Sequence, residues 1–166
     1  MGQRRFHYDR AFEHYLRAKA IPYVSVDEAK KALHGHVSLK SFDFVVYGAD
    51  GRNLLVDVKG RKHGGRSTRQ LDNWVTEDDV TCLTEWQKIF GKGFRGALAF
   101  LYWCDEQPPD ALFHEIFEFG GRWYAVLGAE VDAYREHMKQ RSPKWQTVHV
   151  PAEAWQRISR PLVEML

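Results

Sequence analysis

The chain has 166 residues, of which 44% are hydrophobic, 14% aromatic and 28% charged. This composition predicts one globular domain with a proper core and excludes disordered, collagen-like and low-complexity classes. No apolar run approaches the ~18 residues of a membrane helix, and the N-terminal residues lack the apolar core of a signal peptide. We therefore expect no membrane association. Because the chain has only two cysteines, we also expect no disulfide framework and a cytoplasmic location.

The net charge of +2 (24 Lys and Arg minus 22 Asp and Glu) decides nothing about a nucleic-acid partner, so the position of the charges matters. Residues 59–69 carry no acid and three glycines, which predicts a flexible basic loop containing Lys59, Arg61, Lys62, Arg66 and Arg69. Residues 135–144 add four more basic side chains. These two segments fit phosphate binding, and an ordinary solvated loop is the alternative.

The first hundred residues predict the element order α-β-β-β-α-β. Helical spacing of Tyr8, Phe12 and Leu16 indicates a first helix over residues 7–19. The pattern then predicts a strand at 21–26, a helical turn and loop at 28–40, two strands of a hairpin at 42–47 and 54–59, a helix from the capping box of Thr76–Asp79 to Gly91, and a buried strand at 94–103.

The remaining residues predict an elaboration of the same domain. We expect a hairpin of residues 112–119 and 122–127, a helix at 130–140, a strand at 146–150 and a last helix starting at Pro151. No internal repeat or linker divides the chain, so residues 1–166 form a single predicted domain, with its core at about 7–103 and its elaboration at 104–166.

Two aspartates interrupt the apolar strands of the first hairpin. If Ala49–Gly51 form a three-residue loop with Gly51 in the left-handed conformation, paired residues sum to 100 and Asp43 lies opposite Asp57. Their Cβ atoms would then be about 4.5–5.5 Å apart. A two-residue turn at Asp50 and Gly51 would instead place Asp43 opposite Val58 and put the aspartates on opposite faces.

Facing carboxylates repel each other, so an opposite charge must compensate them. A divalent cation such as Mg²⁺ prefers oxygen ligands and retains several waters. Lys59 shares a strand face with Asp57 and can position a water that attacks phosphorus. The three residues thus suit phosphodiester hydrolysis, and two edge-strand aspartates beside a solvated lysine are the alternative.

The segments Ser41-Phe-Asp43 and Val56-Asp-Val-Lys59-Gly-Arg resemble the motif of the PD-(D/E)XK nuclease superfamily. Phe42 stands where the motif often has proline, and the second half has its Asp-x-Lys form. The resemblance covers roughly residues 7–103 and is greatest to small members similar to archaeal Holliday-junction resolvases. It implies an α/β fold of the restriction-endonuclease-like type, with an αβββαβ core and a mixed sheet, to which a C-terminal hairpin and helices are appended.

The resemblance also implies accessory residues. A glutamate of the first helix often adds a metal ligand, and Glu13 is the candidate, with a plain surface glutamate as the alternative. A polar residue of the second long helix sometimes reaches the site, and Gln87 is the candidate, with a backbone-bonded core amide as the alternative.

These observations together predict a Mg²⁺- or Mn²⁺-dependent nuclease acting on DNA. Asp43, Asp57 and Lys59 form the expected catalytic set, and the Val58 carbonyl and Glu13 are further expected metal ligands. The expected phosphate contacts are Lys40, Arg61, Lys62, Arg66 and Arg69. The alternative is a catalytically inactive nucleic-acid-binding or assembly module of the same fold, and the likeness to resolvases suggests a homodimer.

Overall fold

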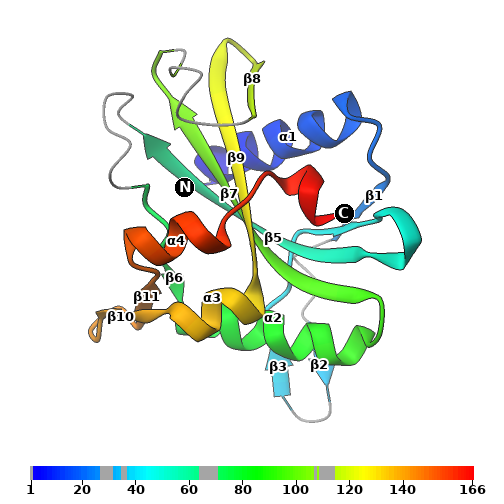
Figure 1. Cartoon of the computed structure of the whole chain (residues 1–166), viewed down its shortest axis with the longest axis vertical. Helices are drawn as coiled ribbons and strands as arrows, with labels where there is room; N and C mark the ends of the chain where they lie inside the picture. The colour runs from blue at the N-terminus through cyan, green and yellow to red at the C-terminus, as the bar shows by residue number, and fades with distance from the viewer. Residues whose placement is uncertain (1, 27–31, 35–36, 64–70, 107, 109–114) are drawn as a thin grey trace.

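The computed structural model describes residues 2–26, 32–34, 37–63, 71–106, 108 and 115–166. A mixed sheet lies at its centre, with helices on both faces (Figure 1). The strand order is β1-β4-β5-β7-β9-β8. The expected α/β fold class, with a mixed sheet and an appended C-terminal part, is confirmed.

The two long central strands run parallel and the outer strands run antiparallel to their neighbours. β5 (Asn53–His63) pairs with β7 (Phe94–Cys104) along its whole length. On one side of β5 lie β4 (Phe44–Val46) and β1 (Tyr23–Ser25), and on the far side of β7 lie β9 (Arg122–Glu130) and β8 (Ile116–Phe119). β5 is apolar at Leu54–Val56 and Val58, and β7 is rich in Ala, Leu and Phe, as strands buried on both faces require.

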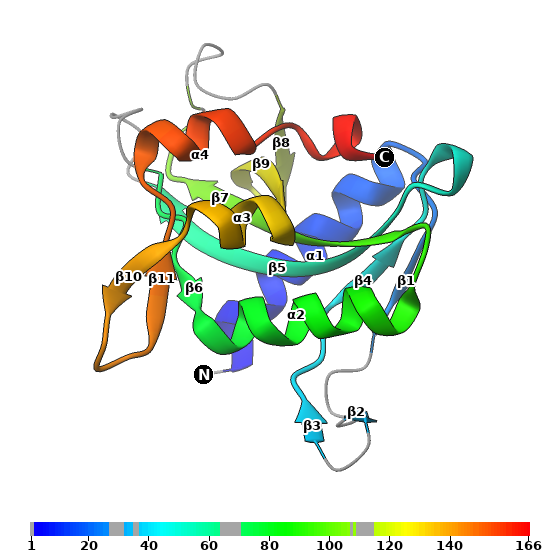
Figure 2. The same cartoon turned by 60° about the horizontal axis from the view of Figure 1, so that its bottom comes forward.

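The strand alternation divides the core into two layers. Val45, Leu55 and Leu98 point to the face covered by α2 (Glu77–Phe90), α3 (Val131–His137) and α4 (Ala152–Ile158). Val56 and Phe44 point to the face covered by α1 (Gly2–Ala18) and the short 3-10 helix η2 (Leu162–Met165). Figure 2 shows α2 along one face of the sheet and α1 on the other. A residue of α1 and a residue of α2 therefore meet only around an edge or end of the sheet.

The connection from β5 to the parallel strand β7 passes through α2. Thr76 accepts a hydrogen bond from the Asp79 amide at 3.1 Å, and the Asp79 carboxylate accepts one from the Thr76 amide at 3.0 Å. These reciprocal bonds are the predicted capping box, and they satisfy two donors that a helix start leaves unpaired. The helix ends at Gly91, whose φ of 80° favours glycine. The expected start and end of this helix are confirmed.

Three predicted elements were wrong. Described residues of the expected helical turn and loop at 28–40 form a small hairpin, β2 (Ala32–His34) with β3 (Val37–Leu39), and residues 28–31, 35 and 36 lie outside the described part. The expected helix at 130–140 ends at His137, because β10 (Lys139–Ser142) joins β11 (Thr147–His149) and β6 (Val75–Thr76) in a second sheet. Residues 60–63 of the expected basic loop continue β5, and residues 64–70 lie outside the described part.

Within the described ranges, no helix has the length and apolar character needed to cross a bilayer.

Candidate active site

The first hairpin has the register that opposes the two aspartates. The β4–β5 pairs are Phe44 with Val56, Val45 with Leu55 and Val46 with Leu54, each of which sums to 100. The turn is the three-residue one, with Gly51 at a φ of 71°. Asp50 is left-handed as well, with a φ of 54°, so the short 3-10 turn Ala49–Gly51 contains a residue of non-helical conformation. This is the register expected to set Asp43 against Asp57; the ladder itself ends at the Phe44–Val56 pair, one residue before Asp43.

Asp43 ends the ladder between the two strands with its side chain. Its backbone amide donates to the Val56 carbonyl at 2.9 Å, and its Oδ2 accepts from the Val58 amide at 2.6 Å. A charge-assisted bond of this length is strong, and it fixes the Asp43 carboxylate against the backbone of Val58. Asp43 and Asp57 are each only 5% exposed. Two acidic side chains are thus buried in this part of the sheet, with the Asp43 carboxylate bonded to the backbone of Val58, the residue after Asp57.

Lys59 supplies positive charge at this point, and it lies between two carboxylates. Its Nζ is 3.0 Å from Asp57 Oδ2 and 3.1 Å from Asp79 Oδ2. Asp79 comes from the first turn of α2 and is 4% exposed. Lys40 also pairs with Asp79 through its ammonium group. The buried cluster therefore joins β5, the segment before β4 and the N-terminal end of α2.

Asp79 is the site residue that the sequence analysis missed. It was recognised only as the third helical residue of the capping box, where its role is local. The same carboxylate that accepts from the Thr76 amide also contacts Lys59. One signal was available in the sequence. The strand that carries Lys59 is followed by the helix that starts at Glu77, and the N-terminal end of that helix must pack beside the strand. Which of the three acids in its first turn would face inward was not readable from sequence.

The electrostatic environments of Asp57 and Asp79 differ. Burial raises the pKa of Asp57, the charge of Lys59 opposes that rise, and the nearby charge of Asp79 adds to it. Burial alone would raise the pKa of Asp79 too, but Lys59, Lys40 and the Thr76 amide outweigh it and lower the pKa to about 2. Asp79 is therefore the firmly ionised member that holds both ammonium groups, and Asp57 is the member whose charge is least compensated.

This difference predicts an acid-stability effect of Asp79. In the parent, the free energy of unfolding should fall as the pH drops from 3.8 toward 2, since unfolding lets this carboxylate take up a proton that the folded state refuses. In Asp79→Asn, the free energy of unfolding should decrease by up to roughly 2 kcal/mol less than in the parent over this pH range. Denaturant melts at several pH values, in chelator, measure the slope. Thr76→Ala is the matched control, which costs about 1 kcal/mol at every pH through loss of the cap. Equal slopes in parent and Asp79→Asn would contradict this assignment.

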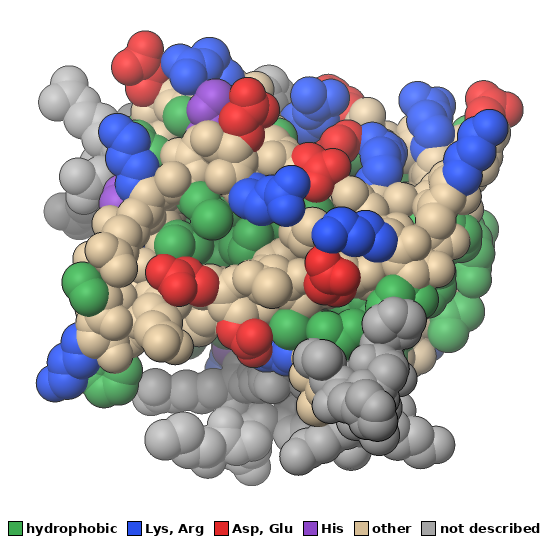
Figure 3. All heavy atoms as spheres, turned by 90° about the horizontal axis from the view of Figure 1, so that it is seen from below, with side chains coloured by type: hydrophobic (Ala, Val, Ile, Leu, Met, Phe, Trp, Pro, Cys, Tyr) green, Lys and Arg blue, Asp and Glu red, His purple; other side chains and the backbone are tan. Residues whose placement is uncertain are grey.

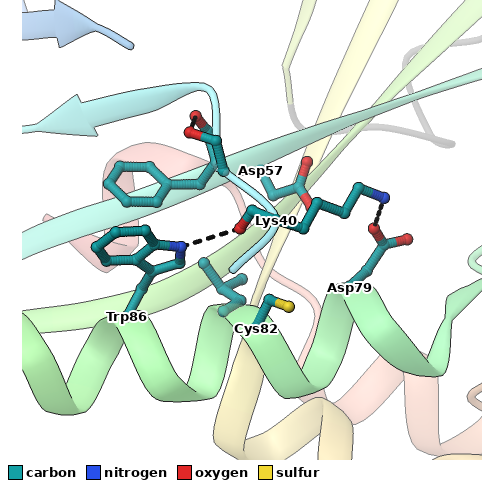
Figure 4. A pocket seen from close by; sticks show the side chains of 8 residues that line it. Lys40, Asp57, Asp79, Cys82 and Trp86 are labelled. Atoms are coloured by element: carbon teal, nitrogen blue, oxygen red, sulfur yellow. Dashed lines mark hydrogen bonds and ion pairs between the residues drawn. The ribbon is translucent and has the colours of Figure 1, made fainter. Parts of the chain in front are cut away.

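Asp57 faces a narrow recess between β5 and α2. Figure 4 shows the Lys40 side chain crossing between Asp57 and Asp79, with Trp86 of α2 below it. The Trp86 indole donates to the Lys40 carbonyl at 2.9 Å, which fixes the backbone that leads into β4. Lys40 is 42% exposed, so its flexible side chain is the movable cover of this recess.

The structure does not bring Glu13 or Gln87 to the cluster. Glu13 accepts from the Tyr23 hydroxyl at 2.7 Å and from Arg17 at 3.1 Å, on the helix that covers the other face of the sheet. Gln87 accepts from the Gly96 amide at 2.7 Å and donates to Asp132 at 3.0 Å. It lies eight residues after Asp79, about 12 Å along the helix. These bonds connect α2 to β7 and α3. The bond to the Gly96 amide corresponds to the alternative that the sequence left open, in which Gln87 is bonded to the backbone.

The expected phosphate contacts have different surroundings. Arg61 donates to the carbonyls of Gly60 and Trp74 and stacks on the Trp74 ring, so the chain itself occupies its guanidinium group. Lys62 is 59% exposed, 3.4 Å from Asp105, and over the Trp103 ring. Arg66 and Arg69 lie outside the described residues. On the face seen in Figure 3, Lys and Arg alternate with Asp and Glu, without a patch of one sign.

The donors that could hold a metal are oxygen atoms. Within the part of the chain that the structure describes, no three His, Cys, Asp or Glu side chains converge on one point. Asp43 and Asp57 with the neighbouring backbone are an oxygen-only set with few protein ligands. This set fits Mg²⁺, which commonly binds one or two carboxylates and keeps most of its waters, better than it fits Zn²⁺.

The comparisons with known proteins support the fold. No protein-family model matches the sequence, and no curated protein matches it. Among solved structures, the chain is similar to Hjc, a Holliday junction resolvase from the archaeal hyperthermophile Archaeoglobus fulgidus, with a TM-score of 0.57 and 13% sequence identity. The match covers 96% of this chain and 97% of that one. The likeness thus includes the C-terminal part, for which sequence analysis found no counterpart.

Proposed function

We propose that this protein is a metal-dependent nuclease that hydrolyses phosphodiester bonds of DNA. The observation that carries the proposal is the buried Asp57–Lys59–Asp79 arrangement beside Asp43, at one point of a sheet that otherwise buries apolar side chains. Burying three carboxylates costs free energy that a scaffold need not spend. The likeness in fold to a Holliday junction resolvase agrees with this function.

Each residue has a distinct role in the proposed site. Asp43 and Asp57 hold a divalent cation, with the Val58 carbonyl as a third oxygen donor. Lys59 donates from its ammonium group to the attacking water and to the phosphate. Asp79 positions Lys59 through the 3.1 Å contact and keeps it from turning wholly toward Asp57. Asp79 is therefore a positioning residue that acts through Lys59.

The cation, when bound, supplies Lewis-acid stabilisation of phosphate charge and makes a bound water more acidic. The chain's own contribution is Lys59, whose ammonium group lies 3.0 Å from Asp57 and opposes the rise that burial gives to the pKa of this carboxyl. Lys40 is 42% exposed and can leave the recess when a substrate arrives, while Lys59 remains paired with the buried Asp79 carboxylate.

The test is a cleavage assay with purified protein on matched DNA substrates of one sequence: duplex, four-way junction, flap and single strand. We expect cleavage with Mg²⁺ or Mn²⁺ and none in chelator. A single-stranded RNA of the same sequence serves as the comparison for sugar specificity. Cleavage that persists in chelator would contradict metal dependence.

The second candidate is a nucleic-acid-binding or assembly module without turnover. The closed recess over Asp57 and the lack of three convergent ligands among the described residues favour it. It predicts DNA binding that is equal with and without Mg²⁺, and no product on any of the four DNA forms. Sedimentation of the same samples tests the homodimer that the resemblance suggests.

A further inference from the structure

A second cavity lies beside the small sheet of β10, β11 and β6, away from the recess over Asp57. Its volume is about 260 Å³. One wall is the segment Leu71–Trp74 that leads into β6, the other is His149–Ala152 between β11 and α4, and Arg141 of β10 lines it as well. Small-molecule sites span roughly 300–1,000 Å³, so this cavity suits one flat ring system and not a whole nucleotide chain.

The two walls are held together by one buried side chain. Asn73 is 5% exposed; its amide nitrogen donates to the Val150 carbonyl and its amide oxygen accepts from the Val150 amide, both at 2.9 Å. The Tyr134 hydroxyl donates to the Asn73 carbonyl at 2.7 Å. Because these bonds fix both backbones, the cavity is formed before any ligand arrives, and binding there costs little ordering entropy.

The cavity offers an aromatic face next to positive charge. Trp74 lines it, and two guanidinium groups lie against the Trp74 ring, with Arg61 at 4.0 Å and Arg141 at 5.1 Å from its centroid. Only Arg141 of the two arginines lines the cavity, and it is exposed. Arg61 extends from β5 of the central sheet and donates to the Trp74 carbonyl. A ring that enters the cavity can therefore stack on Trp74 or on the plane of Arg141, with a phosphate near Arg141.

Polar atoms along the walls can contact the edge of such a ring. His149 lines the cavity and contributes an imidazole ring to its wall. The exposed carboxylate of Asp72 lies on the opposite wall. Asp72 thus offers an acceptor, His149 a ring nitrogen and Trp74 an aromatic plane around one ring-sized space. Proteins bind nucleobases outside a duplex with groups of these kinds.

The cavity is connected to the candidate active site by short stretches of chain. Arg61 follows Lys59 by two residues on β5, about 7 Å along the strand. Trp74 precedes Asp79 by five residues, and only the two-residue strand β6 and the helix start separate them. A nucleic acid whose backbone lies at Lys59 therefore passes within reach of the cavity.

We propose that this cavity binds one unpaired nucleobase of the nucleic acid substrate, stacked on the Trp74 ring where the Arg141 guanidinium group lies in the free protein. This inference rests on the proposed nuclease function and deepens it, since it makes DNA with an unpaired or extruded base the preferred substrate class. A perfectly paired duplex cannot fill the cavity without the energy of unstacking a base.

The test compares two DNA probes by fluorescence anisotropy in chelator, where no metal-dependent cleavage occurs. One is a duplex with a single unpaired nucleotide, and the other is the same duplex with an abasic residue at that position. The parent should bind the first probe roughly 5- to 100-fold more tightly, as stacking of one base on an aromatic side chain provides. Trp74→Leu should remove this difference and leave binding of the abasic probe unchanged.

Trp145→Leu is the matched control. Trp145 lies in the turn between β10 and β11, is 69% exposed and does not line the cavity. It should retain the preference for the base. Equal binding of both probes by the parent overturns the inference and needs no variant, so misfolding of Trp74→Leu cannot hide that result. Loss of the preference in Trp145→Leu as well would assign it to the hairpin surface and overturn the cavity. Metal-dependent cleavage of both probes by the parent, measured separately, shows whether the nuclease function stands when the base preference fails.

Discussion

Asp57→Asn and Lys59→Ala should each lower the rate of DNA cleavage at least about a hundredfold, because each removes charge that the reacting phosphate or its cation requires. Lys59 is 3.0 Å from Asp57, so the two changes disrupt one unit and the double variant should be hardly slower than the slower single variant. Single-turnover rates on the best DNA substrate, with saturating Mg²⁺ or Mn²⁺, measure this.

Lys62→Ala is the control for the loss of a lysine on the same strand. Lys62 is 59% exposed, and its described ionic partner is Asp105, not the buried cluster. With the protein in saturating excess, loss of one expected phosphate contact weakens binding but not the cleavage step, so this variant should cut at a rate within a few-fold of the parent. Parent-like cleavage by Asp57→Asn or Lys59→Ala would place the chemistry elsewhere in the molecule.

The same Asp57→Asn variant should not lose stability in chelator. Burial raises the pKa of Asp57, so the folded state holds its proton to higher pH than the unfolded chain does, and the stability of the parent decreases as the pH rises through that pKa. At neutral pH the variant is relieved of that cost. Urea melts of both proteins at pH 7 in chelator check the sign, and a clearly less stable variant would mean that the Lys59 pair outweighs the burial of the charge.

The second large effect is stabilisation of the parent by the metal itself. At a concentration of Mg²⁺ or Mn²⁺ ten times its dissociation constant, the free energy of unfolding should rise by about 1.4 kcal/mol. For a chain of this length, that is a rise in Tm of roughly 3–6 °C. Asp43→Asn should lose most of the rise. An asparagine oxygen can still accept the 2.6 Å hydrogen bond from the Val58 amide, so the change removes charge and keeps the local structure.

Asp50→Asn is the control for that experiment, because Asp50 lies in the turn of the same hairpin and is exposed. Asparagine tolerates the left-handed conformation of this position, so the control should fold well and show the full metal-induced rise. Equal rises in the parent and in Asp43→Asn would show that Asp43 is not a ligand and would favour the module without turnover.

The sequence alone predicted the elements whose causes are local. Gly51 and the alternation of the two strands left two registers open, and the three-residue turn was preferred because Gly51 fits its left-handed position and the proposed chemistry needs facing aspartates. The strand pairs that sum to 100 confirm that register. The capping box at Thr76 and Asp79 predicted the start of α2, because its bonds are local as well. The helix–strand order of the core followed from these elements.

Tertiary structure alone decided the properties that depend on contacts between distant residues. Asp79 became part of the site because the helix start packs against Lys59, twenty residues earlier. Arg61, an expected phosphate contact, donates to the Trp74 carbonyl, and Gln87, an expected accessory residue, donates to Asp132, and neither partner could be predicted from the sequence. Lys139–Ser142 became a strand because β11 offers it a pairing edge. Local sequence sets backbone preference, but the partner of a buried charge or an unpaired strand edge is chosen only when the layers close around it.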